Sequence, residues 1–150
     1  MECMHTLLDV LHVVTAVFLV GPMAILPMSA MRSVRAGDGA AVLTTARSTM
    51  IFSLASLLVV LFGFGVLGVS DEKYDLSVAT PWVLISIILY AVALALNVLA
   101  VVPALRSAGE HLQSAEAGTL RRNDYQRIAI TSGVVTLLLL AVVVLMVAKP

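Results

Sequence analysis

Four long runs without Asp, Glu, Lys or Arg are the feature that most constrains this fold. They cover residues 10–31, 48–70, 76–105 and 128–148, or 22, 23, 30 and 21 residues. Each reaches the ~18 to 20 apolar residues that cross a hydrocarbon core about 30 Å thick. In lipid every backbone N–H and C=O must be paired within the segment, so each run is expected to be a helix. The sequence therefore predicts an all-α polytopic membrane protein, a bundle of four transmembrane helices over residues 6–31, 46–69, 81–106 and 125–148.

The composition agrees with a membrane location. Of the 150 residues, 61% are hydrophobic and 12% are charged, against roughly 45 to 50% and about 25% in soluble domains. Nine basic and nine acidic residues cancel, so no net field favours nucleic acid as a partner. The single cysteine, Cys3, cannot form an internal disulfide. The length allows one domain, residues 1–150.

Basic residues are concentrated in two of the three connections. The first and third connections hold seven arginines: Arg32, Arg35, Arg47, Arg106, Arg121, Arg122 and Arg127. The second connection and the C-terminus hold Lys73 and Lys149. Because cytoplasmic loops carry the excess of Lys and Arg, we expect the arginine-rich connections in the cytoplasm. Both termini and the 71–75 loop are then expected outside.

Local signals mark the helix ends. Thr80 followed by Pro81 and Trp82 predicts the start of the third helix, which is expected to continue to about Gln113 and to stop by Gly118. The sequence of residues 123–126, Asn-Asp-Tyr-Gln, fits a capping box that opens the fourth helix. Asp38, between two glycines, is expected in a turn. Pro22, Pro27 and Pro103 are expected to kink their helices about a turn earlier.

Two faces of the expected helices carry polar side chains that could form a site. His5, Asp9 and His12 are spaced by four and three residues and share one face of the first helix. A carboxylate beside imidazoles could hold a cofactor or a metal ion, whereas hydrogen bonding between helices is the plainer interpretation. Ser86, Tyr90 and Asn97 share one face of the third helix and are expected to face inward. A pocket between His12, Ser86 and Tyr90 is therefore possible.

Two further patterns, a glycine motif and the positions of the histidines, are weaker indications of a function. Residues 63–68 match the pattern GxGxxG, but no strand precedes them, so close helix packing is the better interpretation. A haem with two histidine ligands needs imidazoles on facing helices. His5 and His12 share a helix, and His111 lies in the third connection. A single chain could therefore supply one axial ligand, His12, and a partner chain the other.

Three segments carry a resemblance to a known family. Residues 7–14 (LLDVLHVV), 81–84 (PWVL) and 145–150 (LMVAKP) resemble the bacterial predicted integral membrane proteins of domain-of-unknown-function family 2269. The family is similar, more distantly, to the membrane part of copper-resistance D proteins and to a bacterial four-helix, haem-associated protoporphyrinogen oxidase. His12 matches a histidine of both, but Phe18 stands where Trp is usual before the glycine at Gly21. The resemblance implies the bacterial inner membrane and an unknown activity.

Three functions are open at this stage. The first is an accessory, stabilising or assembly subunit of a larger inner-membrane complex, respiratory or transport, with lipids and other proteins or a second copy as partners. The second is a haem- or copper-linked redox protein that uses His12 with Asp9 and Tyr90, or a metal site at His12 and His5. The third is a small dimeric transporter, which would need broken helices or paired charges in mid-membrane. No cofactor and no enzymatic activity is the favoured expectation.

Overall fold

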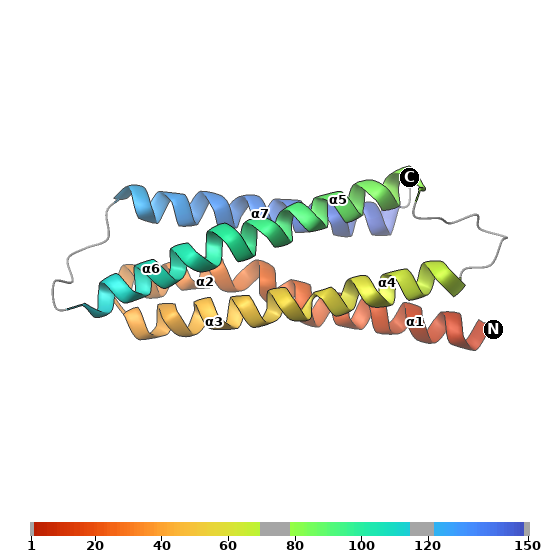
Figure 1. The fold of residues 1–150 in the computed structure, drawn as a ribbon, viewed down its shortest axis with the longest axis horizontal. Coiled ribbons are helices and arrows are strands. Elements are labelled where there is room, and N and C mark those ends of the chain that lie inside the picture. Colours follow the sequence, from red (N-terminus) through yellow and green to blue (C-terminus); the bar gives the residue numbers. More distant parts are fainter. Residues whose placement is uncertain (1, 70–78, 115–121, 149–150) are drawn as a thin grey trace.

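The structure, a computed structural model, describes residues 2–69, 79–114 and 122–148, which form four long helices (Figure 1). The first is built from α1 (Glu2–Thr15), a π-helical turn η1 (Ala16–Val20) and α2 (Gly21–Ala36). The second consists of α3 (Gly39–Ala55) and α4 (Leu57–Val69), and the third of α5 (Pro81–Leu96), the π-helical turn η3 (Asn97–Val101) and α6 (Val102–Gln113). The fourth is α7 (Arg122–Ala148). The predicted all-α, four-helix fold is confirmed.

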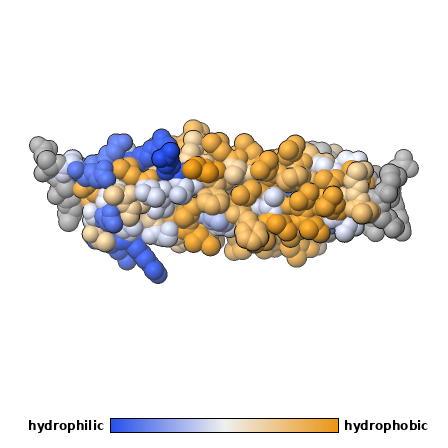
Figure 2. All heavy atoms as spheres, turned by 90° about the horizontal axis from the view of Figure 1, so that it is seen from below, coloured by the Kyte–Doolittle hydropathy of each residue, from blue (hydrophilic) through white to orange (hydrophobic). Residues whose placement is uncertain are grey.

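The four helices run along one long axis, and α1 begins at the same end of the bundle at which α7 ends (Figure 1). We call this the terminal end. The opposite end, the arginine end, carries the exposed arginines of α2, α3, α6 and α7: Arg32, Arg35, Arg47, Arg106, Arg122 and Arg127. Hydrophilic side chains gather there, and hydrophobic atoms cover most of the rest of the face shown in Figure 2.

The two halves of the bundle pack differently. In the arginine half, α2 packs against α3 and α7, and α3 packs closely against α6. In the terminal half, α1 packs mainly against α4, while α5 packs against α7. These two pairs separate toward the terminal end (Figure 1). The first span is accordingly the least buried of the four, with 11% of its most apolar stretch buried against 28% in the third.

The helices are longer than the hydrocarbon core requires. They have 34, 31, 33 and 27 residues, or about 40 to 51 Å at 1.5 Å per residue. Each expected span lies inside one of them, and the third helix ends at Gln113 as predicted. The second and fourth helices begin earlier than expected, at Gly39 and Arg122. The bundle therefore continues as helix beyond the uncharged runs at the arginine end.

The turn between the first two helices is set by a glycine and an aspartate. Gly37 adopts a left-handed conformation, φ 73°, and its N–H donates to the carbonyl of Val34 at 3.2 Å. Without a Cβ, glycine takes this conformation at no steric cost. The carboxylate of Asp38 then accepts from the N–H of Ala41 at 3.0 Å, so Asp38 caps α3, an arrangement worth about 1 kcal/mol.

Two other end signals had different outcomes. Thr80 precedes the helix and Pro81 is its first residue, as predicted, although the Thr80 side chain makes no capping hydrogen bond. The capping box at Asn123 is wrong, because α7 already begins at Arg122 and Asn123 lies inside it. The expected stop at Gly118, the 71–75 loop, Arg121, Lys73 and Lys149 fall outside the described residues.

A π-helical turn lies just before two of the three prolines expected to disturb their helices. The turn η1 ends at Val20, before Pro22, and η3 ends at Val101, before Pro103. Proline lacks an N–H and its ring clashes with the carbonyl four residues earlier. A wider turn relieves that clash at the cost of one regular hydrogen bond. Pro27 lies inside α2 and is buried.

Glycines allow the closest helix contacts. A Cβ on Gly39 would lie 2.7 Å from the carbonyl oxygen of Gly109, so α3 and α6 meet through these two glycines. In the terminal half, a Cβ on Gly63 would lie 3.0 Å from Cε1 of His12, and one on Gly65 would lie 3.4 Å from Leu8. The glycines of residues 63–68 therefore serve helix packing at two of their positions.

Candidate functional site

His12 is held against the second helix by a specific hydrogen bond. Its Nδ1 lies 2.9 Å from the carbonyl oxygen of Val59, and the ring lies over Gly63. A carbonyl can only accept, so Nδ1 carries the hydrogen. In the neutral imidazole the lone pair is then on Nε2, the arrangement in which a backbone carbonyl orients a histidine ligand.

His5 and Asp9 occupy the same helix on its way to the terminal end. His5 is partly buried and Asp9 is exposed. In the described parts of the chain, no group of three or more His, Cys, Asp or Glu side chains is close enough to hold a metal ion. The predicted face of His5, Asp9 and His12 thus supplies one oriented imidazole.

Tyr90, on the third helix, contacts the second helix one turn away from the residue that His12 contacts. Its hydroxyl lies 2.6 Å from the hydroxyl of Ser56, and Ser56 Oγ also donates to the carbonyl of Ser53 at 2.6 Å. Ser56 is the residue at which α3 ends and α4 has not yet begun. The structure therefore brings His12 and Tyr90 to neighbouring residues of one helix, Val59 and Ser56.

Asn97 forms a buried hydrogen bond between the second and third helices. It is fully buried, and its amide N–H donates to Ser53 Oγ at 2.8 Å. Its Oδ1 is the one buried side-chain nitrogen or oxygen without a hydrogen-bond partner among the described residues. Asn97 is also the first residue of η3. This hydrogen bond thus joins the second and third helices at the point where the third passes from α-helix into the π-helical turn η3.

Ser86 is the third member of the polar face of the third helix, but its hydroxyl does not point to a pocket partner. It is fully buried, and its hydroxyl donates to the carbonyl of Trp82 on its own helix at 2.8 Å. The burial of Ser86 and Asn97 confirms the expectation that the polar face of the third helix points inward. The hydroxyl of Ser86 is used within α5, so the possible pocket between His12, Ser86 and Tyr90 gains no free donor from it.

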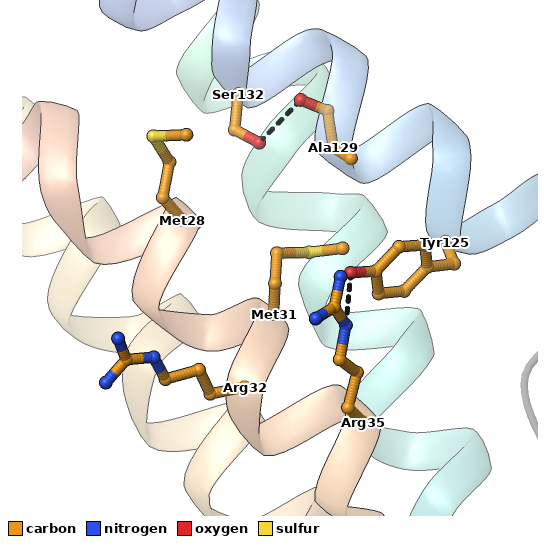
Figure 3. A pocket seen from close by; sticks show the side chains of 7 residues that line it. All are labelled: Met28, Met31, Arg32, Arg35, Tyr125, Ala129 and Ser132. Carbon is orange, nitrogen blue, oxygen red and sulfur yellow. Dashed lines mark hydrogen bonds between the residues drawn. The ribbon is translucent and has the colours of Figure 1, made fainter.

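A cavity of about 310 Å³ lies elsewhere, between α2 and α7 at the arginine end. Figure 3 shows Arg35 pointing toward Tyr125, with Met31 beside it and Ser132 deeper along α7. The Nε–H of Arg35 donates to the Tyr125 hydroxyl at 2.6 Å, and the guanidinium carbon lies 5.3 Å from the centre of the Tyr125 ring. The cavity is lined by Met28, Met31, Arg32, Arg35, Tyr125, Ala129 and Ser132.

This cavity was not predicted from the sequence, because Arg35 and Tyr125 are 90 residues apart. One signal points to it. Arg35 lies in the last turn of α2 and Tyr125 in the first turn of α7. Two helices, the second and the third, lie between these turns in the chain, so the chain crosses the bundle twice and the two turns lie at the same end.

The comparisons with known proteins give a family and no relative of established function. The sequence model of the family described as "Predicted integral membrane protein (DUF2269)" matches residues 6–150. No curated protein and no solved structure matches the chain. This family matches the resemblance drawn from the three short segments.

Proposed function

The chain belongs to the DUF2269 family of predicted integral membrane proteins, and from this premise we propose that it is an accessory subunit of a larger membrane complex. In this role it stabilises or helps to assemble a respiratory or transport complex of the bacterial inner membrane. Its arginine end faces the cytoplasm, in keeping with the excess of basic residues at that end.

The open side of α1 is the observation that supports this role best. Its large apolar side chains are 45 to 67% exposed together with those of η1: Leu7, Val10, Val13, Val14, Val17 and Phe18. They are spaced so that they share one face of the helix, the face turned away from α4, against which α1 mainly packs. Helices associate in lipid through close packing and hydrogen bonds. A helix with one extensive neighbour leaves room for a partner's transmembrane helix.

Site-specific photo-crosslinking in native membranes tests the proposal. A photo-reactive amino acid replaces Val13 on α1, which is 56% exposed, or Leu137 on α7, which is 66% exposed. Both positions lie 11 residues from the terminal end of their helix, so Leu137 is a matched control. We expect Val13 to yield one discrete protein product that also copurifies in constant ratio, and Leu137 to yield lipid adducts.

Two outcomes contradict the accessory role. One is a monodisperse, partner-free protein in mild detergent, with the same lipid adducts from both positions. The other is a product from Val13 that contains two copies of this chain and no other protein.

A haem- or copper-linked redox protein is the second candidate, because His12 has an oriented Nε2. The chain's own contribution would be the single ligand His12. The other residues predicted for a metal ion or a cofactor are His5, which lies seven residues or about 10 Å away along α1, and Asp9 and Tyr90. A haem would take its second axial ligand from a partner chain. Bound haem or copper supplies one-electron chemistry. The residues present fit one axial position and do not form a complete metal site.

A visible absorption spectrum and metal analysis decide the second candidate. If the protein has this redox role, native-membrane preparations show an absorbance band or bound copper that His12→Ala loses. Phe64→Ala, on the exposed side of α4, is the control and keeps it. Colourless, metal-free wild-type protein that matches His12→Ala eliminates the redox role and leaves the accessory role standing.

A further inference from the structure

We infer that the cavity between α2 and α7 binds an anionic phospholipid, with the lipid phosphate at Arg35. This inference is independent of the proposed accessory role, because it concerns the arginine end rather than the open side of α1. It rests on an oriented cation, an apolar inner wall and the position of both relative to the uncharged runs.

Arg35 is a guanidinium already held in place. Its Nε–H is used by the Tyr125 hydroxyl, and the Tyr125 ring lies at cation–π distance. Among the described residues its two terminal NH₂ groups make no hydrogen bond, and such a pair matches two oxygens of a phosphate. Arg32, one turn closer to the uncharged run, is exposed and extends away from Tyr125 in Figure 3. It can add a second positive charge at the rim by rotating its side chain.

The inner wall of the cavity is apolar. Met28, Met31 and Ala129 contribute sulfur and methyl groups. The hydroxyl of Ser132 donates to the carbonyls of Ile128 and Ala129 on its own helix, so it offers no free hydrogen. A water-soluble phosphate compound would leave this wall uncovered, whereas the first part of an acyl chain would cover it. The volume of about 310 Å³ is at the lower end of the ~300 to 1,000 Å³ common for ligand sites.

The position along the helices suits a lipid. Arg32 and Arg127 are the charges that border the uncharged runs 10–31 and 128–148. Met28 and Ser132 therefore lie on the hydrocarbon side of that border, and Arg35 and Tyr125 on the headgroup side. Met28 and Arg35 are seven residues apart, about 10 Å along a helix. The cavity thus spans the border between headgroups and acyl chains.

Lipid binding to delipidated protein in detergent tests the inference by native mass spectrometry. The probes are phosphatidylglycerol and phosphatidylcholine with the same acyl chains. We expect the wild type to bind one phosphatidylglycerol in preference to phosphatidylcholine. Loss of a hydrogen-bonded charge costs about 1.5 to 3 kcal/mol. Arg35→Gln should therefore weaken phosphatidylglycerol binding about 10- to 150-fold.

Arg127→Gln is the matched control, because Arg127 is exposed at the same end of the bundle, on α7, and does not line the cavity. It should bind like the wild type. Tyr125→Phe keeps the ring but loses the hydroxyl that holds Arg35, and should lie between the two. Tyr125→Phe also gives the decisive comparison with Arg127→Gln if Arg35→Gln fails to give a monodisperse, helical protein.

Three results overturn the inference. Equal weakening by Arg35→Gln and Arg127→Gln would indicate general surface charge rather than a site. Equal affinity of the wild type for both lipids would remove the role of the anion. Displacement of phosphatidylglycerol by millimolar inorganic phosphate or glycerol 3-phosphate would indicate a soluble phosphate compound as the ligand.

Discussion

Asn97 shows how one side chain can fix the relation between two membrane helices. Its amide donates to Ser53, and its carbonyl oxygen has no partner among the described residues. Interhelical hydrogen bonds of this kind average about 0.6 kcal/mol in membrane proteins, with a maximum near 1.7. The contact is modest in energy, but it is directional, so it specifies which face of η3 meets α3.

Ser53→Ala tests this contact at the residue scale. The substitution removes the acceptor of Asn97, so we expect it to lower the free energy of unfolding by about 0.6 to 1.7 kcal/mol. Ser86→Ala is the matched control, because Ser86 is equally buried and its hydroxyl donates within its own helix. Unfolding in mixed micelles with increasing sodium dodecyl sulfate measures both. A larger loss for Ser86→Ala would contradict the interhelical role of Ser53.

At the scale of elements, glycine pairs decide where helices touch. Gly39 and Gly109 bring the backbones of α3 and α6 together at the arginine end, with Leu43 beside Gly109. Gly63 does the same for α4 and the His12 ring of α1. The first contact is backbone to backbone and cannot relax, whereas the second meets a side chain that can shift.

Gly39→Ala is therefore expected to weaken the α3–α6 contact. The new Cβ would lie 2.7 Å from a backbone oxygen, and overpacking of this kind costs about 1 to 3 kcal/mol. Gly133→Ala on α7 is the control, because nothing lies within 4 Å of its Cβ position. It should be neutral or stabilising by up to about 1 kcal/mol. Thermal unfolding in one detergent compares the two variants, and similar losses would contradict the assigned contact.

The elements also show how far a single sequence can be interpreted. Uncharged length predicted four helices, and Thr80 with Pro81 predicted where the third begins. The second helix was predicted to begin at residue 46 but begins at Gly39, because Arg47 was assigned to the first connection. Asp38 was recognised as a turn residue but not as a cap. Polar residues leave helix possible when neighbouring helices and a cap support it, and that support depends on contacts distant in sequence.

The candidate sites divide in the same way. Spacing along a single helix predicted that Ser86, Tyr90 and Asn97 face inward. The hydrogen bonds from His12 to Val59 and from Arg35 to Tyr125 depend on the rotation of one helix against another. The spacing of residues within one helix does not determine how that helix is rotated against its neighbours. The cavity at the arginine end was therefore found from the structure.

At the scale of the whole molecule, the expected orientation is open to a direct test. Cys3 is exposed near the terminal end, and Ala40 is exposed at the arginine end. We expect a membrane-impermeant maleimide to label Cys3 in intact spheroplasts, because the arginine end should be cytoplasmic. The matched variant Cys3→Ser with Ala40→Cys should be labelled after permeabilisation alone. The reverse pattern would show that the protein is inserted the other way round.

The uneven packing of the bundle has a consequence for how the molecule opens. Backbone amides exchange with solvent deuterium through local opening, and openings are easiest where few contacts must be broken. The arginine half joins four helices in mutual contact, while α1 relies mainly on α4. Local opening should therefore begin where α1 separates from the bundle at the terminal end, with η1 as the hinge. The amides of the arginine half should be the last to lose protection from exchange.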